Sequence, residues 1–180
     1  DGYANNYISS NYLIDFSSGL INSFASMPHC GGLYGQNDEI EIKKLLAMIK
    51  DMVAERKALF TQHDVSNYDS YIQIAPLPMI VVVIDNIAGF NAFKDGSSFM
   101  LNFYEYLRDS HSCGIKFVIS CNHVNEVNLR SKQELGTRIA FTLKDRYVYG
   151  DALNVRCDYV PPTIAGRGLF VEDGEVTEFH

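Results

Sequence analysis

The chain has 180 residues, 47% of them hydrophobic, which suits one domain with a full core better than two independent domains. A net charge of −7 argues against broad binding to nucleic acid, because that affinity comes from clustered Lys and Arg. No apolar run approaches the length of a bilayer crossing, so we expect any membrane association to come from sequence outside this chain or from a partner. We therefore expect a single domain over residues 1–180.

Four cysteines, at positions 30, 113, 121 and 157, show no CxxC or other metal-ligand spacing. Cys113 and Cys121 lie in apolar surroundings, which predicts two small buried thiols. Free thiols of this kind indicate a reducing, cytosolic setting.

Residues 11–16 have a short apolar strand pattern that stops at a Ser-Ser-Gly turn. Asp15, near the end of this strand, would add a carboxylate to the edge of a sheet if its neighbour runs parallel. Residues 20–27 are ambiguous, and residues 28–32 are expected to break any regular element. His29 in this break is either a ligand or, more commonly for such positions, a packed turn residue.

Residues from 38 onward form the clearest helix, with Asp38 and Glu41 spaced as a capping box. Apolar residues recur along it at intervals of three and four, which predicts one stripe packed on a sheet. They are Ile42, Leu45, Leu46, Ile49, Met52 and Val53.

A run of β-branched apolar residues at 80–84 ends abruptly in Asp85 and Asn86. Such a run, without polar alternation, predicts a strand buried on both faces in the middle of a parallel sheet. Ligands bind outside the carboxyl ends of such strands, where Asp85 and Asn86 would lie. The alternative is that Asp85 only caps the following turn.

The rest of the chain continues an α/β alternation. After a loop rich in turn residues we expect a helix at 99–108, a glycine cap at Gly114 and a strand at 115–121 with Asn122 at its end. Short helices at 128–135 and 147–153, a strand at 137–143 and a hairpin turning at Asp173-Gly174 follow.

Four blocks, taken in order, resemble the FtsK/SpoIIIE family of hexameric, RecA-like P-loop ATPases, most closely the ATPase domains of the type VII secretion coupling proteins EssC and EccC. The blocks are residues 13–20 with 27–32, residues 38–60, the strand ending at Asp85, and residues 114–120 with 136–141. Residues 166–169 look like the family's GRG loop. The resemblance implies a RecA-like three-layer α/β fold with a mainly parallel central sheet and a C-terminal β-hairpin, here lacking the N-terminal P-loop unit.

The resemblance also implies a site. Asp85 matches the Walker B aspartate, which orients the Mg²⁺ held between the nucleotide phosphates, and Asn122 matches a polar sensor beside it. These two would be the catalytic residues, and Asn86, Gly166 and Arg167 would join them in binding nucleotide. Mg-ATP is thus the implied cofactor, with the metal held by Asp85 through the nucleotide, although nothing in this chain alone requires it.

Three departures from the family pattern bear on hydrolysis. Asn86 replaces the glutamate that follows the Walker B aspartate, and an amide can orient water but cannot take its proton. No G-x-x-x-x-G-K-[ST] motif occurs, and the chain begins with the block that lies downstream of that loop in the family. Where the DNA motors carry several arginines, residues 108–111 keep only Arg108.

We therefore expect a degenerate ATPase domain of a type VII secretion motor that acts in binding or regulation, with weak or absent hydrolysis. The alternative is an active Mg-ATP-hydrolysing motor domain whose P-loop lies upstream; a DNA translocase ranks third because of the acidic charge. The resemblance implies other ATPase domains of the same chain and secreted substrates with C-terminal export signals as partners. It further implies a hexamer for the full-length protein, and no strong nucleic-acid binding is expected. It also implies a cytoplasmic location at the inner face of the bacterial membrane, as part of a membrane-anchored protein.

Overall fold

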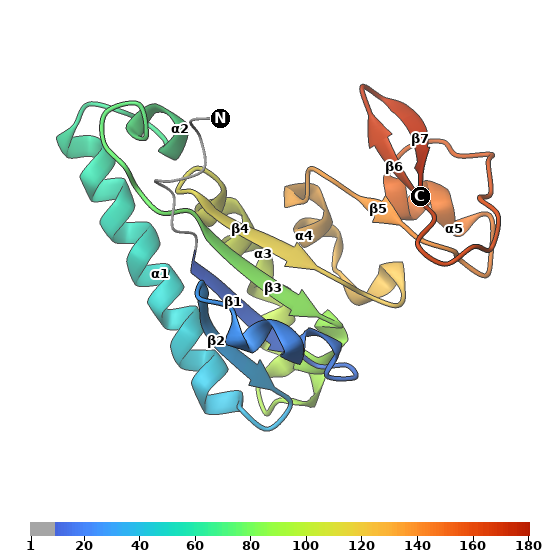
Figure 1. Ribbon diagram of the computed structural model, residues 1–180, viewed down its shortest axis with the longest axis horizontal. Coiled ribbons are helices and arrows are strands. Elements are labelled where there is room, and N and C mark those ends of the chain that lie inside the picture. Colours follow the sequence, from blue (N-terminus) through green and yellow to red (C-terminus); the bar gives the residue numbers. More distant parts are fainter. Residues whose placement is uncertain (1–9) are drawn as a thin grey trace. The chain divides into compact units, whose positions relative to one another are not determined.

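The structure, a computed structural model, describes residues 10–180 (Figure 1). They form two compact units, one comprising the chain up to residue 122 with residues 126–132, the other residues 123–125 and 133–180. The expectation of one domain over residues 1–180 stays a prediction. The first unit contains β1 (Ser10–Asp15), β2 (Cys30–Gly35), β3 (Ile80–Asp85), β4 (Ile115–Ile119), α1 (Glu39–Gln62), α2 (Tyr68–Tyr71), α3 (Gly96–His111) and α4 (Leu129–Glu134).

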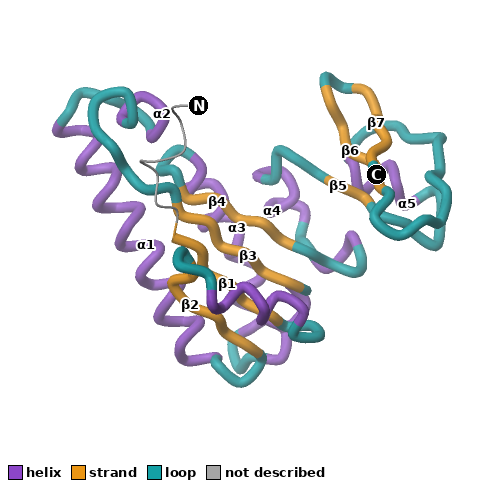
Figure 2. The backbone as a smooth tube through the Cα atoms, in the orientation of Figure 1, coloured by secondary structure: helices purple, strands orange, loops and turns teal. Residues whose placement is uncertain are grey.

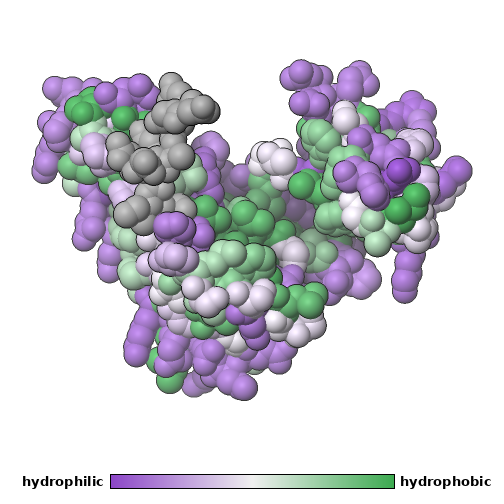
Figure 3. Space-filling view, in the orientation of Figure 1, coloured by the Kyte–Doolittle hydropathy of each residue, from purple (hydrophilic) through white to green (hydrophobic). Residues whose placement is uncertain are grey.

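The four strands of the first unit form a parallel sheet in the order β2-β1-β3-β4 (Figure 2). The apolar run at 80–84 is therefore an interior strand, as predicted. Ile80, Val82 and Ile84 are buried, whereas Val81 and Val83 are only half-buried. The expected burial on both faces is thus wrong for one face, and Figure 3 shows apolar residues over the strands on the side turned to the viewer.

The helices α1 and α3 contact each other and pack on the sheet. The predicted stripe of α1 is buried except for Met52, which is half-buried. On α3, the ring of Phe103 is fully buried and meets Phe117 of β4 edge to face, with 5.7 Å between the ring centroids. These contacts make the helix-covered face of the sheet the main core of the unit.

The predicted capping box at the start of α1 is wrong. Asp38 precedes the helix, but its side chain does not bond to the first turn. Instead Asp38 Oδ2 accepts the backbone N–H of Gly35 at 2.7 Å, while Asp38 N–H donates to the carbonyl of Gly35 at 3.1 Å. The side chain closes the turn between β2 and α1, so it is not available to cap the helix.

The expected break at residues 28–32 is confirmed for the turn at residues 28–29 but wrong for residues 30–32, because both glycines belong to the edge strand β2. A Cβ at Gly31 would lie 2.7 Å from the ring of Tyr12, and one at Gly32 would lie 2.5 Å from the hydroxyl of Tyr34. The glycines therefore serve close approach of tyrosine rings to an edge strand, a use of glycine that local pattern does not distinguish from a turn.

Further differences are local. The expected loop after Asn86 contains a 3₁₀ segment (Ile87–Ala92), and 3₁₀ segments also occupy Leu20–Ser26 and Val124–Glu126. The helix α3 begins at Gly96 and not at residue 99, and α2 was not predicted. Gly114 has φ +69°, as expected of a left-handed cap. Cys113 is fully buried, but Cys121 is exposed, so one of the two predicted buried thiols is wrong.

The second unit contains β5 (Ile139–Ala140), α5 (Val148–Leu153), β6 (Gly168–Glu172) and β7 (Glu175–Phe179). Its three strands form an antiparallel sheet in the order β5-β6-β7, and the predicted strand at 137–143 shrinks to the two residues of β5. The predicted hairpin is confirmed, with positive φ at both Asp173 (51°) and Gly174 (83°). Ala140, Tyr149, Leu153 and Leu169 form the core of the unit.

Among residues 10–180, no helix combines the length and the apolarity needed to cross a bilayer.

Candidate functional site

Polar side chains gather at the carboxyl edge of the parallel sheet. β1 ends at Asp15 and β3 at Asp85, and the two residues are register partners in parallel strands. The second carboxylate expected at this edge is therefore present. Ser120 directly follows β4, and its backbone N–H donates to the carbonyl of Ile84 at 2.9 Å. This is the edge at which parallel α/β sheets bind ligands.

Ser120 holds the carboxylate of Asp85. The hydroxyl oxygen of Ser120 lies 2.5 Å from Asp85 Oδ1 and accepts the backbone N–H of Asn86 at 2.8 Å. A serine hydroxyl has a single proton, so that proton is donated to Asp85. Within residues 10–180, Asp85 Oδ2 makes no hydrogen bond, which leaves one carboxylate oxygen for water or a ligand.

Asn86 adopts a left-handed backbone conformation, with φ 62° and ψ 73°. Asparagine tolerates this region better than most residues. Its side-chain Nδ2 donates to the carbonyl of Phe16 at 3.4 Å, just beyond the end of β1. The backbone of Phe16 in turn donates to the carbonyl of Asp85 at 3.0 Å. Asn86 therefore links the ends of β1 and β3.

Two oxygen atoms at this edge are buried without a hydrogen-bond partner in the described part of the chain. One is Asn86 Oδ1, and the other is Oδ2 of Asp15. Asp15 is only 7% exposed, and its other oxygen accepts the N–H of Ser17 at 2.8 Å. A buried polar atom without a partner is unusual, so both atoms are able to accept a bond from water or a bound group.

Asn122 lies three residues beyond the end of β4, the strand paired with β3. It is exposed, and its backbone N–H donates to Glu126 Oε2 at 2.8 Å. The strands β3 and β4 are neighbours, as expected, but β4 ends at Ile119, so the predicted strand end at residue 121 with Asn122 directly after it is wrong. The side chain that meets Asp85 is that of Ser120. Sequence reasoning missed Ser120; the signal was that it is the first polar residue after the apolar residues 117–119 that end β4.

No family model matches the chain. The ESX secretion system protein YukB of Bacillus subtilis (strain 168) is 30% identical over 138 residues, which are 75% of this chain and 9% of YukB. The solved structure of EssC (ATPases 2 and 3) from Geobacillus thermodenitrificans superposes with a TM-score of 0.85 at 26% identity, covering 97% of this chain and 34% of that one. The chain is homologous to the ATPase domains of the EssC/EccC type VII secretion proteins.

The predicted family and the predicted α/β fold are thereby confirmed. EccC (ATPases 2 and 3) of Thermomonospora curvata, solved with a signal sequence peptide, has a TM-score of 0.75 at 22% identity, over 92% of this chain and 31% of that one. At that identity the match supports the fold alone. The chain spans 9 to 11% of the length of the curated relatives it matches.

The EssC/EccC fold implies Mg-ATP, and the oxygens at the sheet edge fit the metal end of that group. Mg²⁺ takes oxygen ligands and keeps several waters, typically using one or two carboxylates together with nucleotide phosphates. Within residues 10–180, Asp85 Oδ2 is an oxygen atom of this kind without a hydrogen bond, whereas Asp15 Oδ2 and Asn86 Oδ1 are buried. Within residues 10–180, no group of three or more His, Cys, Asp or Glu side chains is placed to hold a metal. A metal here would therefore depend on the nucleotide and on water, and the role of Asp85 in holding it stays a prediction.

Gly166 and Arg167 lie in the second unit, just before β6. Gly166 has φ +83° with open space at its Cβ position, and Arg167 Nη1 pairs with Glu178 Oε1 of β7 at 3.1 Å. Tyr159 donates its hydroxyl to the other oxygen of Glu178, and this bond raises the pKa of the Tyr159 phenol. Arg167 thus has a structural partner within its own unit, and its predicted contact with nucleotide stays a prediction.

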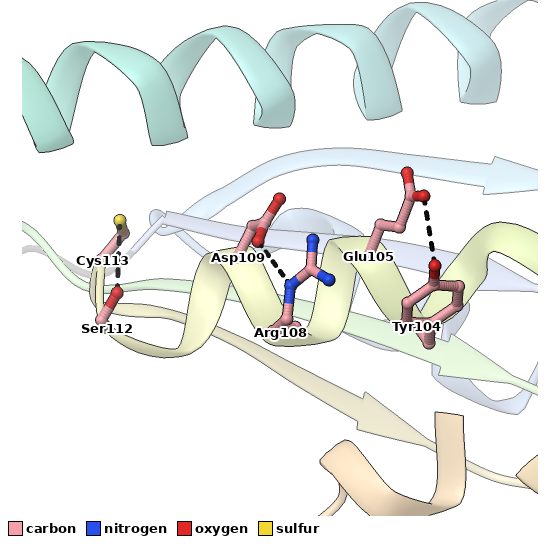
Figure 4. Close-up of polar contacts among 6 residues, drawn as sticks. All are labelled: Tyr104, Glu105, Arg108, Asp109, Ser112 and Cys113. Carbon is pink, nitrogen blue, oxygen red and sulfur yellow. Dashed lines mark hydrogen bonds and ion pairs between the residues drawn. The ribbon is translucent and has the colours of Figure 1, made fainter. Parts of the chain in front are cut away.

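The arginine that precedes β4 is also engaged (Figure 4). Arg108 Nε donates to Asp109 Oδ1 at 2.9 Å, and this hydrogen bond lowers the pKa of the Asp109 carboxyl. The Arg108 guanidinium also lies 5.7 Å from the ring centroid of Tyr104, where Arg130 approaches to 5.4 Å. Figure 4 shows Tyr104, Arg108 and Asp109 along α3, with Arg108 pointing to Asp109. The contacts indicate a surface cluster that stabilises α3 locally.

Proposed function

We propose that this chain is a degenerate ATPase domain of a type VII secretion motor protein, which acts in binding or regulation during protein export with weak or absent ATP hydrolysis. The observation that carries this proposal is Asn86. It stands where the family has the glutamate that polarises the attacking water, directly after Asp85. An amide has no basic oxygen able to accept that proton near neutral pH.

The environment of Asn86 supports the same conclusion. Its amide bonds to the carbonyl of Phe16, and its backbone is held in the left-handed region. A side chain tied to the end of the neighbouring strand serves to connect β1 and β3. The position is therefore used structurally, which gives a physical reason for an amide at a site where the family's chemistry uses a carboxylate.

Under this proposal Asp85 keeps the metal-orienting role of a Walker B aspartate, and Asn122 is a second polar group of the site. Asn86, Gly166 and Arg167 would contribute to nucleotide binding if a nucleotide is held. Proposed partners are the neighbouring ATPase domains of the same protein and exported substrates with C-terminal signals, by analogy with the peptide-bound EccC. The proposed location is the cytoplasmic face of the cell membrane, as part of a membrane-anchored protein, since a relative was solved as the cytoplasmic domain of EssC.

The test compares ATP turnover and nucleotide affinity of the full-length protein with those of its Asp85→Ala variant. Asp69→Ala is the matched control, because Asp69 is an exposed aspartate of α2. We expect wild type and both variants to turn over ATP at the same rate, since other domains of the protein would supply the activity. Turnover lost specifically in Asp85→Ala would favour the alternative, a working Mg-ATPase domain. Tight DNA binding at physiological salt would support a translocase instead.

A further inference from the structure

Ser120 is bound to β3 and its continuation by four hydrogen bonds. Its backbone N–H donates to the carbonyl of Ile84 at 2.9 Å, and its carbonyl accepts the N–H of Ile87 at 3.0 Å. Its hydroxyl accepts the N–H of Asn86 at 2.8 Å and donates to Asp85 Oδ1 at 2.5 Å. The backbone bonds fix where the hydroxyl is, and the Asn86 N–H fixes which way its proton points.

We infer that Ser120 is the positioning residue for Asp85: its hydroxyl holds Oδ1 so that Oδ2 is the oxygen presented to a nucleotide-bound Mg²⁺. The inference rests on the proposed nucleotide site at Asp85. The physical reason is that an aspartate at a strand end rotates about two side-chain torsions, and each unproductive rotamer lowers the fraction of protein ready to bind metal. A hydrogen bond from a fixed donor selects one rotamer before the ligand arrives.

The contact is suited to substitution because it lies at an exposed position. Ser120 is exposed, so alanine would leave Asp85 Oδ1 and the Asn86 N–H accessible to water without opening a core cavity. Threonine keeps the hydroxyl, and the exposure of the site leaves space for its methyl group. Ser98, an exposed serine of α3, provides a matched control.

The first measurement needs no nucleotide. Two quantities are compared between the 180-residue wild type and its variants. One is the NMR coupling that reports the Asp85 side-chain torsion, and the other is the exchange rate of the Asn86 amide proton. We expect a single Asp85 rotamer in wild type, Ser120→Thr and Ser98→Ala. In Ser120→Ala we expect averaged couplings and exchange of the Asn86 amide faster by about tenfold, as loss of one hydrogen bond predicts. Unchanged couplings in Ser120→Ala would overturn the positioning role.

The second measurement uses the full-length protein with ATPγS as the probe, in the presence of Mg²⁺ or of EDTA. Because other domains of the protein would also bind nucleotide, the site at Asp85 is read as the part of the Mg²⁺-dependent binding that Asp85→Ala removes. We expect Ser120→Ala to weaken the Mg²⁺-dependent affinity by about tenfold, with Ser120→Thr restoring it and the EDTA value unchanged. Equal Mg²⁺-dependent affinity in wild type and Ser120→Ala would refute the link to metal. If Asp85→Ala leaves the wild-type Mg²⁺-dependent affinity unchanged, the nucleotide site at Asp85 is itself wrong and the metal role of Ser120 falls with it. The Asp85 couplings still decide separately whether Ser120 orders this side chain.

Discussion

Arg56 of α1 carries a charge into the interior of the first unit. The residue is 8% exposed, and its guanidinium donates to backbone carbonyls in place of a carboxylate. Nη1 lies 2.6 Å from the carbonyl of Cys113 and 3.4 Å from that of Gly114, and Nη2 lies 2.6 Å from the carbonyl of Pro78. Burial lowers the pKa of Arg56. These carbonyls precede β4 and β3, so Arg56 joins α1 to the start of both strands.

Replacing Arg56 with methionine keeps much of the side-chain length but removes every donor. In Arg56→Met the carbonyl of Gly114 still accepts the N–H of Ile80 at 3.0 Å. The carbonyls of Cys113 and Pro78 lose their short hydrogen bonds from the guanidinium. Two bonds from a charged donor are together worth about 3–6 kcal/mol. Removing a buried charge returns part of its desolvation cost, so we expect a net destabilisation of about 2–4 kcal/mol. Arg56→Lys should lose less stability than Arg56→Met, because an ammonium group keeps the charge and can still donate hydrogen bonds. It should not reach wild-type stability, because it lacks the forked donors of a guanidinium.

The assay is urea unfolding of the 180-residue chain, monitored by circular dichroism. Hydrogen exchange of the β3 and β4 amides shows whether the transition belongs to the first unit. Arg108→Met is the control, because the Arg108 side chain is 53% exposed. We expect the midpoint for Arg56→Met to fall well below those of wild type and the control. If Arg56→Met unfolds within about 0.5 kcal/mol of the Arg108→Met control, the carbonyl bonds of Arg56 contribute no net stability and the reasoning is wrong.

Three further predictions concern single positions. Asn86→Glu should not raise the ATP turnover of the full-length protein above the wild-type rate and should cost about 1 kcal/mol of stability, because glutamate disfavours φ 62°; a raised rate would show that the missing base alone limits hydrolysis. Gly114→Ala should destabilise the chain by about 2–4 kcal/mol in urea unfolding, since its φ is +69° and a Cβ would lie 2.1 Å from the ring of Tyr68; a neutral effect would contradict the close packing. The pKa of Asp109 is lowered by Arg108, so the pair stabilises the fold above the ordinary carboxyl pKa and this contribution disappears as pH falls through the lowered value. Asp109→Asn should therefore lower stability slightly at pH 7 and not at pH 2, in unfolding curves measured at both values.

Local patterns in the sequence were sufficient for the elements whose own residues determine them. The period of three and four in α1 predicted which side chains are buried, because a helix that packs on a sheet needs one apolar stripe. The β-branched run predicted β3 as an interior parallel strand, and Asp173-Gly174 predicted the hairpin between β6 and β7, since both positions of that turn require positive φ. The family resemblance also followed from short sequence motifs, each of which can be recognised without knowing the tertiary structure.

The tertiary structure decided what depends on partners distant in the chain. Gly31 lies in β2 against the ring of Tyr12, which belongs to the neighbouring strand β1, and the sequence around Gly31 carries no sign of that ring. Ser120 meets Asp85 because the register of β4 on β3 aligns Ile84 with Ile119, and a register is set by whole strands and not by any one residue. The sequence by itself thus identified Asp85 and the departure at Asn86, whereas the pairing of strands determined which side chains hold them.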